Sequence, residues 1–416
     1  MPNIAGSGAS KKGIMDNVGI WIFCIYVLSS YIANDVIVPS ALNTLALYAF
    51  LAYSAVYTVT KWRVRISQTT VWFGVFLLVS LGTMLYSPEK QILGGSFYLL
   101  IVAFILVTCL SQYQINRRRI ETILWTYAMA SPVMLLILSA TGNLIIKTGD
   151  AEEALRLGEE LLGNANILAL MIMLSVLYAL WLLIYSKNGW IKKILLMASV
   201  AVNYYGMFLS GGRKYIIVPI LFLYVLLLFK QDKKGRTHLL RSTAIVVIAA
   251  VGVYLLIMNV PTFYEMIGSR MESLFSFLEG DDKSALGSDK VRSEMIRIGL
   301  EKWKSSPLWG YGFDSFKYFN REATGHFYYS HNNFVEMLYN GGVIGFIAYY
   351  WIYAKGLISA LRSRGKASQG ARAFIIAMVL SMLFYEYGAI NYTSTGTIIM
   401  FYIAEQMMQI NAENAN

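Results

Sequence analysis

The sequence is poor in charge and in cysteine. Only 14% of its 416 residues are charged and 57% are hydrophobic, whereas a soluble globular domain carries about 25% charged residues. This composition excludes a soluble globule. Cys24 and Cys109 both fall in apolar stretches, and no CxxC or Cys/His ligand spacing is present. Neither a disulfide framework nor a zinc site is therefore expected, and both cysteines are interpreted as small buried side chains.

Nucleotide-binding motifs are missing as well. The sequence contains no GxxxxGK[ST] loop, no GxGxxG after a strand and no long soluble domain. Those motifs are the ones whose backbone amides hold nucleotide phosphates. An ATP-driven pump is therefore not expected.

Long apolar runs, in contrast, recur along the whole chain. Each run of about 20 residues can cross roughly 30 Å of hydrocarbon as a helix, and lipid favours helices because they satisfy their own backbone polar groups. We therefore predict an all-α polytopic integral membrane protein, with a single transmembrane domain over residues 1–416. About twelve spans are expected, at residues 17–33, 41–60, 70–86, 92–113, 121–140, 164–186, 190–208, 214–229, 242–259, 332–354, 373–390 and 395–411.

The basic residues predict the orientation of these spans. Short cytoplasmic loops of membrane proteins carry an excess of Lys and Arg. With a cytoplasmic N-terminus, most basic clusters fall inside, at residues 11–12, 61–65, 117–119, 187–193, 230–241 and 362–372. The short outer loops then hold only Lys90, Lys147, Arg156, Arg213 and Lys214. We expect both termini in the cytoplasm, and since the net charge of +11 is then mostly topological, no nucleic-acid partner is expected.

Two outer loops are long enough to carry a function. Residues 260–331 form a large extracytoplasmic loop, in which we expect helices at 262–279 and 289–306. Loops longer than about 15 residues are usually functional or disordered. The second loop, residues 141–163, is expected to contain a short amphipathic helix at 152–157. Its glutamates fit a solvated face better than a site.

A glycine- and cation-rich segment, SGGRK (210–214), joins two expected spans at the outer side. Glycine lets the backbone approach a ligand closely. An arginine at the following helix start, Arg213, adds a fixed cation where the helix N–H groups also attract anions. The segment therefore suits a phosphate, although an arginine that reaches up to the lipid headgroups explains the same pattern.

The large outer loop contains further arginines, among them Arg270, Arg292 and Arg297. Arg292 and Arg297 are five residues apart and do not share one helix face well. Arg292 is positioned to lie over the mouth of the membrane domain. Most charges in such a loop are solvated, so the spacing alone assigns none of them to a site.

A polar cluster, His331-Asn332-Asn333, leads directly into an apolar span. With an ordinary pKa near 6.5, a histidine such as His331 can accept a proton from a sugar hydroxyl at neutral pH. Alternatively, His331 is structural, and Asn332 and Asn333 are capping residues at the helix start. His326 competes for the same catalytic role, whereas His238 lies in a basic inner loop.

Four segments, in this order, resemble the O-antigen ligase/polymerase superfamily: GNANILA (163–169), SGGRKYII (210–217), VRSEMIRIGLEKWKSSPLWGYGFDSF (291–316) and SHNNFVEMLYNGGVIGF (330–346). This group comprises polytopic membrane glycosyltransferases, including Wzy-type polysaccharide polymerases and WaaL-type O-antigen ligases. The resemblance covers about residues 163–350 and lies on the expected outer side throughout. The first five spans contribute only a similar hydropathy.

The resemblance implies a GT-C-like glycosyltransferase in the bacterial cytoplasmic (inner) membrane, with its active site facing the periplasm. The donor would be a glycan on undecaprenyl diphosphate. Residue by residue, Arg213 and Arg292 would bind the diphosphate, and His331 would deprotonate the acceptor hydroxyl, with inversion at the anomeric carbon. Lys214 is a second cation beside Arg213, and either one could meet the phosphate. The chain lacks a DxD motif, which fits a reaction without a metal ion or another cofactor.

The function that this resemblance favours is a polymerase for O-antigen or a related surface polysaccharide, with lipid-linked repeat units as donor and acceptor. The alternative within the family is a ligase that transfers the glycan to lipid A–core in lipopolysaccharide biosynthesis. A chain-length regulator and a flippase are partners implied by the family alone. A flippase or transporter would itself carry charges in mid-span, and Glu336, Glu386 and Glu405 leave that other class open.

Overall fold

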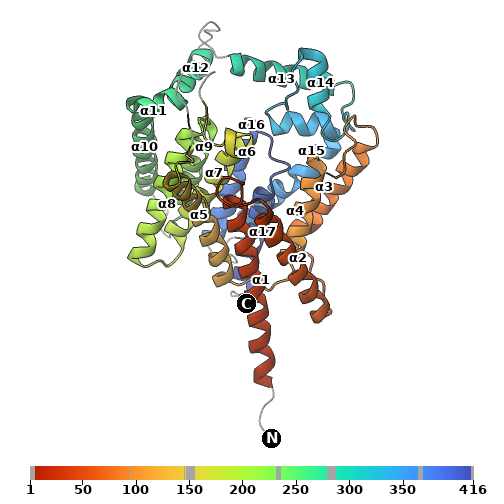
Figure 1. Ribbon diagram of the computed structural model, residues 1–416, viewed down its shortest axis with the longest axis vertical. Helices are drawn as coiled ribbons and strands as arrows, with labels where there is room; N and C mark the ends of the chain where they lie inside the picture. Colours follow the sequence, from red (N-terminus) through yellow and green to blue (C-terminus); the bar gives the residue numbers. More distant parts are fainter. Residues whose placement is uncertain are drawn as a thin grey trace.

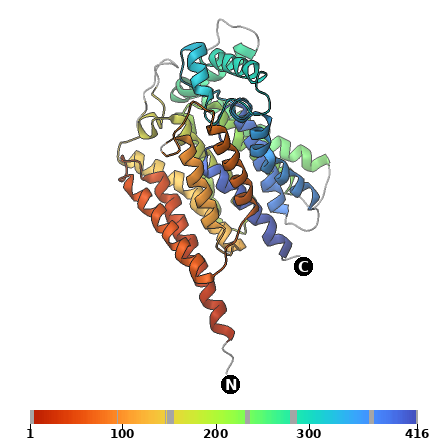
Figure 2. The same ribbon diagram turned by 90° about the vertical axis from the view of Figure 1, so that its right-hand side faces the viewer.

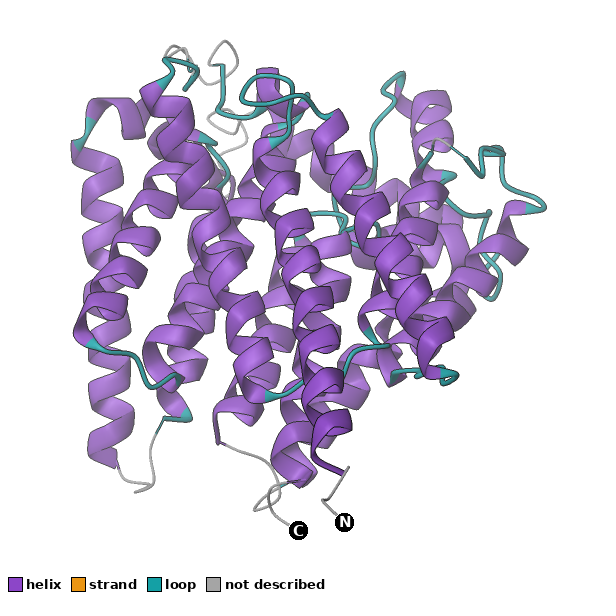
Figure 3. Ribbon diagram, turned by 60° about the horizontal axis from the view of Figure 1, so that its bottom comes forward, coloured by secondary structure: helices purple, strands orange, loops and turns teal. Residues whose placement is uncertain are grey.

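Helices make up the regular structure of this protein. The computed structural model describes residues 5–93, 95–144, 146, 155–230, 236–278, 287–363 and 369–413. Within these ranges no strand occurs, and the helices run side by side as a bundle (Figure 3). The bundle helices are α1 (Ala5–Ile32), α2 (Ala41–Lys61), α3 (Gln68–Met84), α4 (Ser96–Leu110), α5 (Arg117–Ala140), α7 (Ala165–Tyr185), α8 (Trp190–Leu209), α9 (Arg213–Leu228), α10 (Arg236–Asn259), α15 (Asn333–Arg362), α16 (Gln369–Tyr387) and α17 (Thr395–Glu413).

Each of the expected spans overlaps one of these bundle helices. Seven helices are long and apolar enough to cross a membrane, namely α1, α2, α5, α7, α10, α15 and α16, while α3 and α4 are apolar but shorter. The all-helical polytopic architecture is thus confirmed for the described part of the chain. The number of twelve spans and the GT-C-like arrangement stay predictions.

The bundle has two distinct ends. We call the end that carries α11 (Pro261–Phe263), α12 (Ser269–Leu278), α13 (Gly287–Trp303) and α14 (Phe316–Thr324) the loop end. Both chain termini lie toward the opposite end, the termini end, beyond which α1 projects (Figures 1 and 2). This arrangement agrees with termini on one side of a membrane, while the identity of that side stays a prediction.

The centre of the bundle is formed by α7 and α16. In each of these helices 72% of the most apolar window is buried inside the bundle, against 11% for α10, whose apolar residues can face lipid instead. α10 accordingly lies at the edge of the bundle (Figure 1). α7 packs against α5, α8 and α9, and α16 packs against α9 and α15.

Helix α15 is broken at Gly342, where φ is +59° and ψ is −161°. The break leaves helical carbonyl and N–H groups without their usual partners, which is costly at membrane depth. Residues 307–312 of the loop end lie in the break and supply the missing partners. The bonds run from Val343 N to Pro307 O (2.9 Å), Ile344 N to Leu308 O (3.3 Å), Tyr311 N to Tyr339 O (2.8 Å) and Gly312 N to Asn340 O (2.8 Å).

The long loop contains the helices expected from its sequence. The first expected helix is divided into α11, the π-helical turn η1 (Tyr264–Gly268) and α12, and the second corresponds to α13. The helix expected at 152–157 lies partly outside the described residues. In its described part the prediction is wrong, because residues 155–157 are not helical: they lead into a turn, and the short helix α6 (Glu159–Leu162) follows. The reason is that Leu157 N donates to Leu209 O (3.0 Å) instead of to a helical carbonyl.

Replacement of Gly342 by alanine should loosen the loop end. A Cβ there would lie 2.3 Å from the Leu308 carbonyl, and the positive φ adds strain, so we expect a loss of roughly 1–3 kcal/mol of stability. The matched control is Gly341→Ala, because a Cβ at Gly341 would meet nothing within 4 Å. Thermal unfolding in detergent and limited proteolysis of residues 307–312 would measure the difference. Equal stability of both variants would contradict this account of the break.

Candidate functional site

A cavity of about 520 Å³, which we call the main cavity, lies at the loop end of the bundle. Its polar wall includes Lys214, His331, Asn166 and Thr393. Deeper in the bundle, its lining is apolar and aromatic, with side chains from α1, α5, α7 and α17: Val27, Tyr31, Tyr127, Leu170, Met171, Leu174 and Ile399. A largely apolar cavity with a few convergent polar groups is the usual form of a ligand site.

Four bundle helices begin at the main cavity. Asn164 caps α7 and accepts from Asn166 N at 2.8 Å, α9 begins at Arg213, Asn332 caps α15, and Ser394 directly precedes α17. Residues in the first turn or cap of each of these helices, or next to the cap, line the cavity. A helix N-terminus carries partial positive charge and free N–H groups, so this convergence favours an anion.

Lys214 is the cation that lines the main cavity. Its ammonium group donates a hydrogen bond to Gly388 O and lies 5.2 Å from the ring centroids of both Tyr215 and Tyr385. Arg213 does not line the cavity, and its guanidinium donates to Arg270 O in α12. The structure thus separates two neighbouring cations that the sequence left equivalent.

Arg156 is a further cation of this region, although no motif in the sequence marked it as a site residue. Its side chain is only 14% exposed, and its Nε donates to Ser210 O (2.7 Å) in the SGGRK segment. Burial, and next the charge of Arg270, lower the pKa of Arg156 to about 10, and Glu159 opposes this shift. A basic residue in a short outer loop runs against the positive-inside bias, and that exception was the signal that could have identified it.

We call Arg156, Arg213, Lys214, Arg270 and Arg292 the cation cluster. The charges of Arg156, Arg213 and Arg292 all act on Lys214. The charges of Arg270 and Arg292 also act on Arg156. Three separate parts of the sequence, the 141–163 loop, the SGGRK segment and the 260–331 loop, therefore contribute positive charge to one region of the loop end.

His331 lines the main cavity and is partly buried. Burial, followed by the positive charges of Arg292 and Lys214, lowers the pKa of His331 to about 3. The imidazole is therefore neutral at neutral pH and can accept a proton. Its backbone has a φ of +55°, which is unusual for a residue with a side chain and is common at functional sites.

The two asparagines after His331 hold the start of α15. Asn332 accepts from Phe334 N (3.0 Å) and Val335 N (3.1 Å) and donates to Tyr387 O (3.0 Å). The capping role considered for Asn332 is thus observed, and Asn332 is not part of the cavity lining. Asn333 is fully buried and accepts from Asn391 N (2.9 Å) in the connection between α16 and α17.

The remaining candidates lie away from the main cavity. His326 is exposed and stacks on Tyr328, with 5.6 Å between the ring centroids. Arg297 is exposed and pairs with Glu294 and Glu301 on its own helix. His238 donates a hydrogen bond through Nε2 to Leu227 O (3.0 Å), near the termini end. Arg270 accepts a hydrogen bond from the Arg213 guanidinium through its backbone carbonyl.

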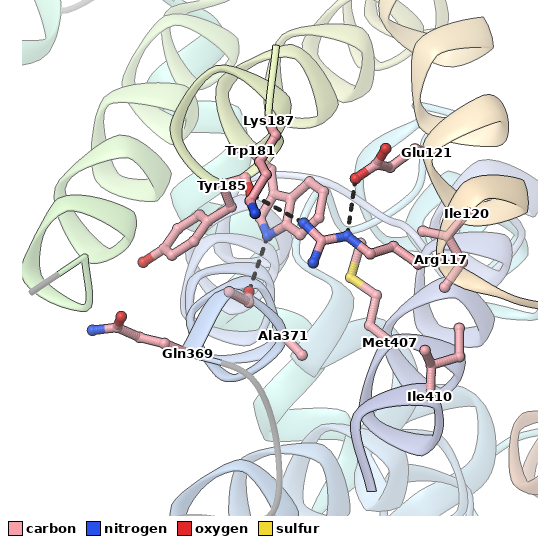
Figure 4. Close-up of a pocket in the computed structure, with 11 residues that line it drawn as sticks. Arg117, Ile120, Glu121, Trp181, Tyr185, Lys187, Gln369, Ala371, Met407 and Ile410 are labelled. Carbon is pink, nitrogen blue, oxygen red and sulfur yellow. Dashed lines mark hydrogen bonds and ion pairs between the residues drawn. The ribbon is translucent and has the colours of Figure 1, made fainter. Parts of the chain in front are cut away.

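A second cavity, of about 300 Å³, lies at the termini end. Figure 4 shows that several of its polar groups already have partners. Arg117 Nε donates to Glu121 (3.2 Å), and Trp181 Nε1 donates to Gly370 O (2.9 Å). Because it lies at the end of the bundle opposite to His331, this cavity is separate from the candidate site.

Comparison with known proteins matches part of this chain to one family. Residues 198–350 match the family described as O-antigen ligase. A search of curated proteins found no match to the chain. The matched residues include Lys214, Arg292 and His331, and they span less than half of the sequence. Over residues 198–350 the chain is therefore similar to O-antigen ligases, which supports the resemblance to the O-antigen ligase/polymerase superfamily.

Proposed function

We propose that this protein transfers a glycan from undecaprenyl diphosphate to an acceptor hydroxyl at the outer face of the bacterial inner membrane. Under this proposal it polymerises repeat units of O-antigen or a related polysaccharide. The observation that carries the proposal is the cavity that Lys214 and His331 both line, with the rest of the cation cluster beside it. An anionic leaving group and a neutral proton acceptor are what such a transfer needs.

The donor diphosphate is assigned to the region between Lys214 and the N-termini of α7, α9, α15 and α17. Lys214 contacts the phosphate oxygens directly, because it is the cation in the cavity wall. Arg292 and Arg213, with Arg156 and Arg270 behind them, supply positive charge around this position. The cluster stabilises the additional negative charge that develops on the leaving diphosphate.

The transfer itself is a single displacement. The oxygen of the acceptor hydroxyl attacks the anomeric carbon of the donor sugar, from the face opposite the diphosphate. The new C–O bond forms as the bond to the diphosphate oxygen breaks, and both electrons of that bond leave with undecaprenyl diphosphate. His331 takes the hydroxyl proton and later releases it to solvent.

Donor binding makes His331 a stronger base. In the free site burial, followed by the charges of Arg292 and Lys214, holds the pKa of His331 at about 3, too low for an effective base at neutral pH. A bound diphosphate neutralises the charges of Arg292 and Lys214 and so raises the pKa of His331, while the effect of burial remains. The base then becomes effective only when a donor is present.

A ligase is the second candidate, since the matched family is described as O-antigen ligase. The donor side of the reaction would be the same, and only the acceptor, lipid A–core, would differ. A flippase fits less well. Glu386 is buried among Tyr349, Tyr353 and Asn391, and Glu405 accepts from backbone N–H groups that start α3. These carboxylates act as local hydrogen-bond acceptors and do not line the main cavity.

Replacement of His331 by asparagine should lower the rate of glycan transfer by about 10²- to 10⁴-fold. Asparagine tolerates positive φ, so the local backbone is preserved while the base is lost. The measurement is product formation from lipid-diphosphate-linked repeat units by the purified, correctly folded protein. The matched control, His326→Asn, changes an exposed histidine outside the cavity and should keep full activity. A fully active His331→Asn variant would refute the assignment of the base.

The pH dependence of the reaction should show how the cation cluster changes the pKa of His331. Since burial, and next the charges of Arg292 and Lys214, lower the pKa of His331 below 6.5, the acidic limb of kcat/KM should lie below pH 6.5. The acidic limb of kcat, which reports the donor complex, should lie at higher pH. Arg292→Gln should move the limb of kcat/KM upward, because one of the charges that opposes protonation is removed. A downward shift in this variant would exclude His331 as the titrating group.

Polymerase and ligase can be separated with the purified protein and defined substrates. With lipid-diphosphate-linked repeat units alone, a polymerase forms a ladder of lipid-linked oligomers. If product appears only after lipid A–core is added, the protein is a ligase. Movement of labelled lipid across liposomes without a new glycosidic bond would overturn both proposals in favour of a flippase.

A further inference from the structure

The connection between α16 and α17, residues 388–394, was not part of any motif in the sequence analysis. We call it the α16–α17 loop. It lies outside residues 198–350, yet several of its residues line the same cavity as Lys214 and His331. Its last residues, with Thr395 at the start of α17, give this wall a row of hydroxyl groups: Thr393, Ser394 and Thr395.

Hydrogen bonds of two buried residues, Asn391 and Tyr392, fix the α16–α17 loop in place. Asn391 donates to Glu386 (2.7 Å) and accepts from Thr397 (2.9 Å). Tyr392 donates through its hydroxyl to Asp314 (3.1 Å), and its backbone N–H reaches the side chain of Asn333 (3.3 Å). Both Asn391 and Tyr392 are buried. The loop therefore presents its remaining side chains at defined positions and loses little entropy when a ligand binds.

Two threonines that line the cavity, Thr393 and Thr395, have side-chain hydroxyl groups without a hydrogen-bond partner in the described part of the chain. Ser394 is committed to the start of α17, where its Oγ accepts from Thr397 N (3.3 Å). Thr393 and Thr395 line the cavity and make no side-chain hydrogen bond to any described residue. Hydroxyl groups that are held in place without a protein partner are available to bind a polar ligand.

The surrounding wall suits a sugar. Asn166 adds an amide, and the tyrosines Tyr329 and Tyr385 add aromatic surface to the same cavity. A sugar ring has both hydroxyl groups and apolar C–H faces, which this combination of polar groups and aromatic rings can contact. Lys214 donates to Gly388 O at the start of the loop, so the proposed phosphate position and the hydroxyl wall are parts of one connected structure.

We propose that the α16–α17 loop, through Thr393 and Thr395, recognises the first sugar of the donor, the one that is bonded to the diphosphate. The inference rests on the proposed function, because a sugar that leaves a diphosphate held by Lys214 has to lie in this cavity. Thr393 and Thr395 are specificity-determining residues here, and they take no part in the proton transfer. The position of the loop outside the matched residues fits an element that differs with the sugar while the phosphate chemistry stays the same.

The test uses two donors whose first sugars differ only in the configuration of one hydroxyl, such as N-acetylglucosamine and N-acetylgalactosamine on undecaprenyl diphosphate. Each donor has its acceptor hydroxyl blocked, and the acceptor glycan carries no diphosphate, so donor and acceptor roles are separate. The ratio of kcat/KM for the two donors is measured for the wild type, Thr393→Val and Thr395→Val. Valine keeps the shape of threonine and removes only the hydroxyl.

We expect at least one of the valine variants to change this ratio by roughly three- to tenfold, the effect of one lost hydrogen bond. Thr141→Val, at the exposed end of α5 and outside the cavity lining, should leave the ratio unchanged. An active wild type with unchanged ratios in both variants would overturn the inference, as would variants that alter only the ranking of acceptors. Failure of the wild type to transfer any glycan would refute the proposed function itself.

Discussion

Positive charges are held close together at the loop end, against their mutual repulsion. Arg156 and Lys214 both lie in the field of Arg292, and burial adds to the cost of their charge. Among these cations, Arg156 is partly balanced by Glu159, at 3.8 Å. The repulsion within such a cluster would be relieved by a bound anion. Burial, followed by the charges of Arg292 and Lys214, lowers the pKa of His331, so the imidazole is neutral at neutral pH. The same cations would thus attract an anion and act on the pKa of His331.

This arrangement depends on backbone that can be irregular near a membrane. The break of α15 at Gly342 is tolerated because residues 307–312 supply the hydrogen bonds that the helix lost. The same insertion fixes the loop end against the bundle. Asp314, two residues after it, accepts from Tyr392 in the α16–α17 loop. The break in α15 therefore fixes the position of residues 307–312 and, through Asp314, of the α16–α17 loop.

The main cavity combines elements of two kinds. Lys214, Arg292 and His331 lie within the residues that match the O-antigen ligase family, whereas Arg156, Asn166 and the α16–α17 loop lie outside them. Under the proposed function, the first group would carry the chemistry of diphosphate and proton, which is the same for any glycan. The second group would support that site and supply the hydroxyl and amide groups of the wall. Such a division would allow one reaction on different sugars.

The sequence by itself determined the helical membrane architecture, because apolar runs of this length in lipid can satisfy their backbone only as helices. The resemblance to a known family predicted Arg213, Arg292 and His331 as site residues, with Lys214 as a second cation that could meet the phosphate instead of Arg213. Both His326 and His331 stayed candidates for the base. Only the tertiary structure placed Lys214 and His331 in one cavity and left His326 at the surface. It alone brought Arg156 and the α16–α17 loop to the site, since contacts between distant segments follow from packing and leave no local pattern.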